Sequence, residues 1–240
     1  MKLFIVKSTL SIIHPCYNPH PGWEEELVRF HKILLSKIPD NFSTNLVLVD
    51  DGSRSGIGKE QLDFIKMEFP DFQYIKNPKN VGKGFALRTA MKQNLSNLII
   101  YTDYDYPYEM KNVWSMFALL NNEKHDIVIG VRDNQYYKKL PFLRKFFSIS
   151  LRLMNHLFFS SMFVKDTQSG LKGFNQKGKE VFLETKINSF LFDTEFIYLA
   201  SKRKDIRMAK ITLHLRDGIV FSTIKFKVIK QELLNFIKLT

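Results

Sequence analysis

The stretch Ile99-Ile100-Tyr101-Thr102-Asp103-Tyr104-Asp105 runs from apolar side chains directly into two acids that are two residues apart. Such an apolar run is typical of a buried strand, and residues two apart on a strand point to the same side. We therefore expect Asp103 and Asp105 to converge where the strand ends. Two acids without a local countercharge are costly there, and a divalent cation shared with a phosphorylated substrate removes that cost. The alternative is a solvated loop in which both acids face water.

Strands and helices alternate on both sides of this stretch. Expected strands cover 9–14, 45–49, 72–76, 98–102 and 126–130, and expected helices cover 23–38, 59–69, 83–94 and 109–121. This alternation predicts an α/β fold with a mostly parallel sheet flanked by helices. In such sheets ligands bind beyond the carboxyl ends of the strands. Because polar and charged residues follow each expected strand, the sequence predicts a site at that rim.

Composition limits the classes of partner and compartment. The 240 residues contain 36 Lys and Arg against 24 Asp and Glu, which gives a formal charge of +12. This excess predicts an anionic partner, either nucleic acid, a phosphorylated metabolite or an anionic membrane surface. The single cysteine, Cys16, excludes an intrachain disulfide framework and is interpreted as a small buried residue at a strand end. No apolar run reaches the roughly 18 residues of a membrane span, so we expect a cytoplasmic chain, peripheral at the inner face of the membrane.

The segment Gly82-Lys83-Gly84 begins an expected helix. It lacks the spacing of a dinucleotide fingerprint and of a Walker A loop. Its glycines allow a ligand to approach the backbone closely at a helix N-terminus, where amide groups favour an anion. An ordinary turn is the alternative.

Taken together, these rim segments resemble family 2 glycosyltransferases with the GT-A fold. The resemblance rests on the segments Val49-Asp50-Asp51-Gly52-Ser53, 80–88 and Asp103-Tyr104-Asp105, which occur in the family's order and spacing. The later segments 166–174 and Phe192-Asp193-Thr194-Glu195 narrow it to the dolichyl-phosphate glucosyltransferase and mannosyltransferase branch. It implies one GT-A domain over 1–223, with a donor half of about 1–132 and an acceptor half of about 133–223. A basic amphipathic helix over 224–240 follows.

The resemblance also implies roles for residues on the donor side. The donor is a UDP- or GDP-hexose, and Asp103 and Asp105 bind the Mg²⁺ or Mn²⁺ that bridges its diphosphate. The remaining implied donor contacts are Pro15, Tyr17, Asp50, Asp51, Gly82, Lys83 and Arg216. Two departures stand out, because Tyr104 occupies a position where the family has a small residue and Lys225 lies further along than the family's lysine.

On the acceptor side, the resemblance implies that Arg132 and Arg144 hold phosphate oxygens of the acceptor or donor. The implied reaction is inverting, with Asp105 among the catalytic residues. A polyprenyl phosphate acceptor is already anionic and requires no general base. If the acceptor is instead a hydroxyl, Asp193 and Glu195 are candidate bases, and Asp166 is a third.

The segment 136–164 bears on the class of acceptor. It combines five lysines and arginines with several phenylalanines, a pattern typical of an interfacial helix at an anionic bilayer. The alternative is a helix that covers the sheet with its cations in solvent.

The main hypothesis is a metal-dependent inverting transferase that moves a hexose to polyprenyl phosphate. Alternatives are transfer to a saccharide hydroxyl in surface-glycan synthesis and a non-catalytic module that binds sugar nucleotides or nucleic acid. The acidic rim argues against nucleic acid.

Overall fold

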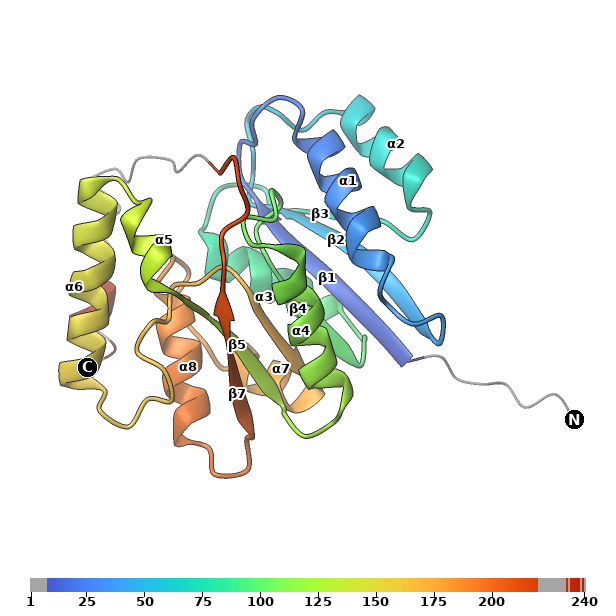
Figure 1. The fold of residues 1–240 in the computed structure, drawn as a ribbon. Coiled ribbons are helices and arrows are strands. Elements are labelled where there is room, and N and C mark those ends of the chain that lie inside the picture. Colours follow the sequence, from blue (N-terminus) through green and yellow to red (C-terminus); the bar gives the residue numbers. More distant parts are fainter. Residues whose placement is uncertain (1–7, 220–231, 233, 238, 240) are drawn as a thin grey trace, which may run out of the picture.

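The computed structural model describes residues 8–219, 232, 234–237 and 239 (Figure 1). Within them, seven strands form one sheet in the order β3-β2-β1-β4-β6-β5-β7. The strands are β1 (Ser8–Cys16), β2 (Phe42–Asp50), β3 (Gln73–Lys76), β4 (Leu98–Tyr101), β5 (Ile127–Arg132), β6 (Lys172–Asn175) and β7 (Met208–Leu213). β6 is antiparallel to β4 and β5, and the other neighbours are parallel. The predicted mostly parallel α/β sheet is confirmed, whereas β6 and β7 were not predicted.

Helices cover both faces of the sheet. They are α1 (Trp23–Leu35), α2 (Lys59–Glu68), α3 (Lys83–Gln93), α4 (Met110–Asn121), α5 (Asn134–Lys138), α6 (Phe142–Phe158), α7 (Gln176–Leu183) and α8 (Phe192–Lys202). The apolar sides of α1, α2 and α4 share one core cluster, and those of α3, α7 and α8 share the other. Successive strand residues enter opposite clusters, as Ile12 and Ile13 or Ile100 and Ile99 do. This alternation of side chains is why the central strands read as continuous apolar runs.

The rim where the parallel strands end is the upper edge of the sheet in Figure 1. β1 ends at Cys16, β2 at Asp50 and β4 at Tyr101, so the loops that follow meet there. Cys16 is buried, as predicted. Because β6 runs the opposite way, the segment 166–171 reaches the same rim before β6 begins. The antiparallel strand therefore brings a second group of polar residues to the carboxyl ends of the parallel strands.

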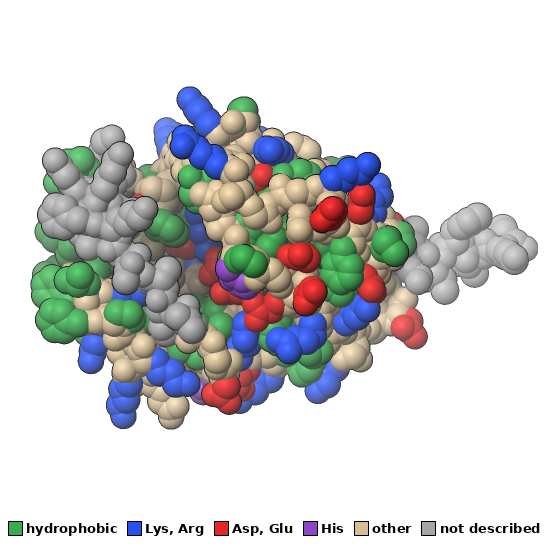
Figure 2. All heavy atoms as spheres, turned by 90° about the horizontal axis from the view of Figure 1, so that it is seen from above, with side chains coloured by type: hydrophobic (Ala, Val, Ile, Leu, Met, Phe, Trp, Pro, Cys, Tyr) green, Lys and Arg blue, Asp and Glu red, His purple; other side chains and the backbone are tan. Residues whose placement is uncertain are grey.

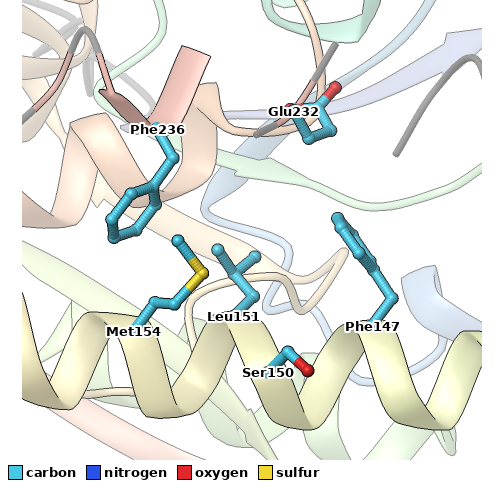
Figure 3. Close-up of a pocket in the computed structure, with 6 residues that line it drawn as sticks. All are labelled: Phe147, Ser150, Leu151, Met154, Glu232 and Phe236. Carbon is cyan, nitrogen blue, oxygen red and sulfur yellow. The ribbon is translucent and has the colours of Figure 1, made fainter. Parts of the chain in front are cut away.

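The helix α6 lies at one end of the molecule (Figure 1). Its inner side lines a small cavity of about 30 Å³, where Phe147, Leu151 and Met154 lie opposite Phe236 (Figure 3). The predicted boundary at residue 223 and Lys225 lie outside the described residues. Most of the predicted helix 224–240 lies outside them as well. Of the predicted helix, residues 232, 234–237 and 239 are described, and they are helical. Among the described residues, no helix combines the length and apolar character needed to cross a bilayer.

Candidate active site

Asp103 and Asp105 lie in a turn at the rim, directly after β4 has ended at Tyr101. The pair is therefore carried by a turn and not by the strand itself. The ammonium of Lys83, the first residue of α3, lies 2.5 Å from Oδ1 of Asp103. The other oxygen of Asp103 lies against Gly170, where a β-carbon would collide with it. Asp103 is thus held between α3 and the segment that precedes β6.

Asp105 differs from Asp103 because it makes no ion pair with any of the described residues. Burial raises the pKa of Asp105 to about 6, and the charge of Asp103 adds to the increase. A cation near Asp105 lowers the free energy of its ionised form. No cluster of three or more His, Cys, Asp or Glu side chains within the described residues could hold a metal ion alone. The two carboxylates therefore suit a divalent cation that takes its other oxygen ligands from a substrate.

Asp50 and Asp51 are both buried, and protein donors already occupy their oxygens. Asp50 accepts hydrogen bonds from the Tyr74 hydroxyl and the Ser53 amide, each at 2.7 Å. Asp51 accepts from the Gly82 amide at 2.7 Å and from Asn77 and Val81 at 3.0–3.1 Å. These hydrogen bonds hold the loops after β2 and β3 in place. Their predicted contact with a base or ribose remains a prediction.

Gly82 and the N-terminus of α3 are packed against the loop before α8. Gly82 has φ +120°, and the carbonyl oxygen of Asn188 lies where a β-carbon would be. The Gly84 amide donates to the same oxygen at 2.8 Å. The first amides of α3 are therefore bonded within the protein, and only the Lys83 side chain extends from this helix end to the acidic turn. The anion site expected at these amides is already filled by a backbone carbonyl.

Asp193 is paired with a buried lysine. The ammonium of Lys172 lies 2.6 Å from Oδ1 of Asp193, and the Tyr101 hydroxyl donates to the same oxygen at 2.5 Å. Lys172 is fully buried, and burial lowers its pKa more than Asp193 raises it. Lys83 also interacts electrostatically with Asp103, Asp105 and Asp193. Three predicted acids thus surround Lys83.

Glu195 lies one turn along α8 and holds a loop in place. One of its oxygens accepts from the amides of Lys186 and Ile187, at 2.9 and 2.8 Å. Arg88 holds the same loop from α3, donating to the Ile187 carbonyl at 2.8 Å and to the Asn188 side chain. Glu195 is buried and faces amides. Its contacts support the loop that carries the Asn188 carbonyl to Gly82.

The predicted arginines have different surroundings. Arg132 is buried and forms a double hydrogen bond with Asp166, whose Oδ2 also accepts from the Arg132 amide at 2.8 Å. Arg216 donates to the backbone oxygens of Asp105 and Tyr106, at 2.9 and 3.0 Å, and to Glu26 at 2.5 Å. Arg216 thus ties the acidic turn to α1. The side chain of Arg144, on α6, is half-buried.

The first loop carries Pro15 and Tyr17 at the rim. Pro15 is buried in β1 opposite Val49, and Tyr17 is 45% exposed. Seen from above the rim, acidic side chains gather beside a hollow, and hydrophobic side chains gather at the α6 end of the molecule (Figure 2). The view agrees with a polar site next to an apolar surface.

Comparison with known proteins identifies the class. Residues 11–176 match the family described as Glycosyl transferase family 2. The chain belongs to this family. Two relatives are named dolichyl-phosphate beta-glucosyltransferase. The one from Dictyostelium discoideum is 29% identical over 204 residues, which are 80% of this chain and 62% of that protein. The one from Saccharomyces cerevisiae is 26% identical over 231 residues, which are 87% of this chain and 68% of that protein.

Solved structures show the same fold for this family 2 glycosyltransferase. One is glucosyl-3-phosphoglycerate synthase from Mycobacterium tuberculosis in complex with Mg²⁺ and uridine diphosphate. It has a TM-score of 0.64 and 14% identity, and the match covers 97% of this chain and 79% of that chain. The likeness confirms the GT-A fold. The chain spans about three fifths of the length of the Dictyostelium relative.

Several residues that build this glycosyltransferase's rim had no role in the sequence analysis. Lys172 lies in the quoted segment 166–174, but the short segment KGFN gave no strand signal, so its burial beside Asp193 was not predicted. Asn188 acts through its backbone oxygen, which no side-chain pattern reveals. His14 and His31, for which metal-ligand spacing is absent, prove to be buried beneath the acidic turn.

Proposed function

We propose that this family 2 glycosyltransferase moves a hexose from a UDP- or GDP-hexose to polyprenyl phosphate, with Mg²⁺ or Mn²⁺ as its cofactor. The observation that carries the donor half of this proposal is the turn of Asp103 and Asp105. It presents two carboxylates at the rim, one of them partly buried and without an ion pair among the described residues. The relatives named dolichyl-phosphate beta-glucosyltransferase support a lipid phosphate as the acceptor.

The carboxylate pair fits a hard divalent cation because both ligands are oxygen and Asp105 makes no ion pair among the described residues. Such a cation, when bound, neutralises the donor diphosphate and stabilises it as a leaving group. Lys83 orients Asp103 through the 2.5 Å contact between its ammonium nitrogen and Oδ1 of that carboxylate. Arg216 holds the backbone of the same turn from the other side.

In the proposed transfer, a phosphate oxygen of the acceptor attacks the anomeric carbon of the hexose. The bond from that carbon to the donor's diphosphate oxygen breaks, so the nucleoside diphosphate leaves and the configuration inverts. The acceptor is already an anion and has no proton to lose. This agrees with the surroundings of Asp193 and Glu195, because protein donors already occupy both carboxylates.

The acceptor side of the proposal rests on a surface that we call the α6 face, formed by Phe142, Phe146, Ile149, Leu153 and Leu157. These side chains recur every three or four residues along one side of the helix, and each is between 47% and 80% exposed. The inner side of the same helix is packed against Phe236, so the α6 face is a second apolar side (Figure 3). A contiguous exposed apolar strip of this kind is typical of an interaction surface.

The charge around the α6 face supports an anionic bilayer as its partner. The segment 134–165 contains six lysines and arginines and no aspartate or glutamate. A groove of about 470 Å³ adjoins the face and is lined by Tyr137, Ile149, Arg152, Leu153, His156 and Lys165. Arg132 is paired with Asp166, and the Lys165 ammonium donates to the carbonyl oxygens of Phe159 and Ser160. We therefore assign the lipid phosphate to Arg152 together with Arg144. Apolar burial and attraction to anionic lipids act in the same direction on such a helix.

A transfer assay tests the proposal. The chain is incubated with Mn²⁺, with UDP- or GDP-hexoses in turn, and with polyprenyl phosphate in vesicles of anionic phospholipid. Sugar is then measured in the extracted lipid-phosphate fraction. We expect transfer from at least one donor, its loss in excess EDTA, and its loss in Asp105→Asn. Product on a saccharide hydroxyl alone contradicts the lipid acceptor, and donor binding without any product indicates a non-catalytic module.

A further inference from the structure

Three side chains form a buried hydrogen-bonded chain directly beneath the acidic turn. The Tyr106 hydroxyl lies 3.0 Å from Nδ1 of His31 and 3.1 Å from Nε2 of His14. Nδ1 of His14 lies 3.0 Å from the backbone oxygen of Thr102. All three side chains are at most 1% exposed. The chain links α1, β1 and the turn that carries Asp103 and Asp105.

The hydrogen-bond chemistry of these groups fixes the position of every proton. The Thr102 oxygen can only accept, so Nδ1 of His14 donates and its Nε2, in the neutral ring, accepts. The Tyr106 hydroxyl must then donate to His14, which leaves its oxygen to accept from Nδ1 of His31. Burial lowers the pKa of His14 to about 4 and that of His31 to about 3, so both rings are neutral at pH 7. The chain thus has one direction, from His31 through Tyr106 and His14 to the backbone of Thr102.

The backbone of Tyr106 explains what this chain holds. Tyr106 has φ +42°, in the left-handed region that non-glycine residues adopt at a cost. The backbone amide of Tyr106 donates to the backbone oxygen of Asp103 at 3.1 Å, and the backbone oxygen of Tyr106 accepts from Nε of Arg216 at 3.0 Å. A strained residue persists only where surrounding contacts overdetermine it. The ring hydroxyl connects this strained residue to His14 on β1 and His31 on α1.

We propose that His31, Tyr106 and His14 are positioning residues that set the separation and orientation of the Asp103 and Asp105 carboxylates for one divalent cation. The inference rests on the proposed donor site, and none of the three side chains touches substrate in this scheme. It predicts that loss of the Tyr106 hydroxyl weakens metal-dependent nucleotide binding more than it weakens the fold. Partners that orient metal ligands commonly change metal affinity by about 10–100-fold when they are replaced.

Tyr106→Phe tests this directly because it keeps the ring and removes only the hydroxyl. UDP binding is titrated calorimetrically at a series of Mn²⁺ concentrations, well below the melting temperature. We expect Tyr106→Phe to need about tenfold more Mn²⁺ for half-maximal UDP binding. Val181→Ala, in the core under α7, serves as a control that lowers stability at a distance from the turn. It is expected to keep the wild-type Mn²⁺ requirement.

A matched pair at His31 keeps the test decisive if Tyr106→Phe does not fold. His31→Asn retains a donor nitrogen near the position of Nδ1, whereas His31→Leu has none. Both variants lose the ring contact with Phe69, whose centroid lies 4.7 Å away. We expect His31→Asn to retain the wild-type Mn²⁺ requirement and His31→Leu to raise it. If His31→Leu binds like the wild type, or if both variants fail alike, the positioning role is wrong. A wild-type protein whose UDP binding ignores Mn²⁺ would instead refute the proposed donor site.

Discussion

The ammonium nitrogen of Lys83 lies 2.5 Å from Oδ1 of Asp103, so the protein itself supplies the countercharge for one acid of the pair. Burial alone lowers the pKa of Lys83, but Asp103 and Asp193 outweigh it and the net shift is upward. Lys83 therefore remains charged. Asp105 has no equivalent partner among the described residues, and its pKa is raised to about 6. The two acids thus differ, because Lys83 anchors Asp103 whereas Asp105 makes no ion pair among the described residues.

Asp105→Asn should therefore separate function from stability. We expect the variant to lose Mn²⁺-dependent UDP binding and transfer, because a neutral amide is a poor ligand for a hard cation. In EDTA its melting temperature should equal or exceed that of the wild type, since the substitution removes a carboxylate that is poorly solvated and repelled by Asp103. Thermal melts in EDTA and calorimetric UDP titrations measure the two effects. A marked fall in melting temperature together with intact UDP binding would contradict this assignment.

Gly82→Ala should damage the site through shape alone. Gly82 has φ +120°, and the Asn188 carbonyl oxygen lies where the new methyl would be, so the N-terminus of α3 must shift with Lys83. Gly22→Ala is the matched control, because Gly22 also has a positive φ, +78°, but has nothing within 4 Å of the new methyl. Gly22→Ala should lose about 1 kcal/mol of stability to left-handed backbone strain, and Gly82→Ala should lose more, because its methyl also meets a backbone oxygen. Only Gly82→Ala should also lose UDP affinity, and equal affinities in the two variants would oppose this account.

Arg132→Ala should lower the stability of the fold and, with it, the rate of transfer. The substitution leaves Asp166 buried without its guanidinium, which costs about 3–5 kcal/mol when a buried pair is broken. The double variant Arg132→Ala/Asp166→Ala should recover most of that loss, because no charge is then left unpaired. Urea denaturation of the single and double variants measures both effects. Unchanged stability in Arg132→Ala would mean that the arginine serves a substrate phosphate and not Asp166.

Much of this architecture follows from local sequence. The alternating strands and helices through β5 and the acidic turn after β4 were predictable, because apolar runs and their polar ends are local signals. The antiparallel strand β6 was not, since its four residues, Lys172 to Asn175, include a lysine and a glycine. Lys172 is tolerated there only because Asp193, on α8, meets it. Such a partnership between distant segments cannot be read from either segment alone.

The acids at the rim show the same limit. The family resemblance implied Asp50 and Asp51 as donor contacts, and it gave Glu195 as a candidate base for a hydroxyl acceptor. In the fold, all three accept hydrogen bonds from nearby protein groups, mostly backbone amides. A sequence shows that an acid is present at a rim, but it does not show whether loop amides have already taken its oxygens. That distinction depends on loop geometry, which is set by tertiary contacts.

Asp126 should govern part of the acid sensitivity of the fold. It lies just before β5 and accepts from Arg207 and Asn175, at 2.9–3.0 Å, so it joins β5 to β6 and β7. The hydrogen bonds from Arg207 hold the pKa of the Asp126 carboxyl well below its usual range. A carboxyl whose pKa is lower in the folded than in the unfolded protein stabilises the fold at every pH above its unfolded-state pKa. That stabilisation is lost as the pH falls from the unfolded-state pKa toward the folded-state pKa. Asp126→Asn should thus be less stable than the wild type at pH 7, and urea denaturation should show the difference shrinking below about pH 4. A difference that stays constant with pH would exclude this charge effect.

The α6 face should bind anionic vesicles, and two substitutions on this face should weaken that binding. Phe146→Ser/Leu153→Ser removes two side chains that are 66% and 56% exposed, so the fold loses little while the bilayer contact loses about 3 kcal/mol, or roughly 100-fold in affinity. Met67→Ser/Leu95→Ser is the matched control, because these residues are 83% and 89% exposed on other elements. Flotation with phosphatidylglycerol vesicles measures the difference. Binding should also fall as salt rises, since salt screens the lysines and arginines of 134–165 from the lipid charge. If the α6 variant floats as well as the control, the α6 face is not the surface that contacts the membrane.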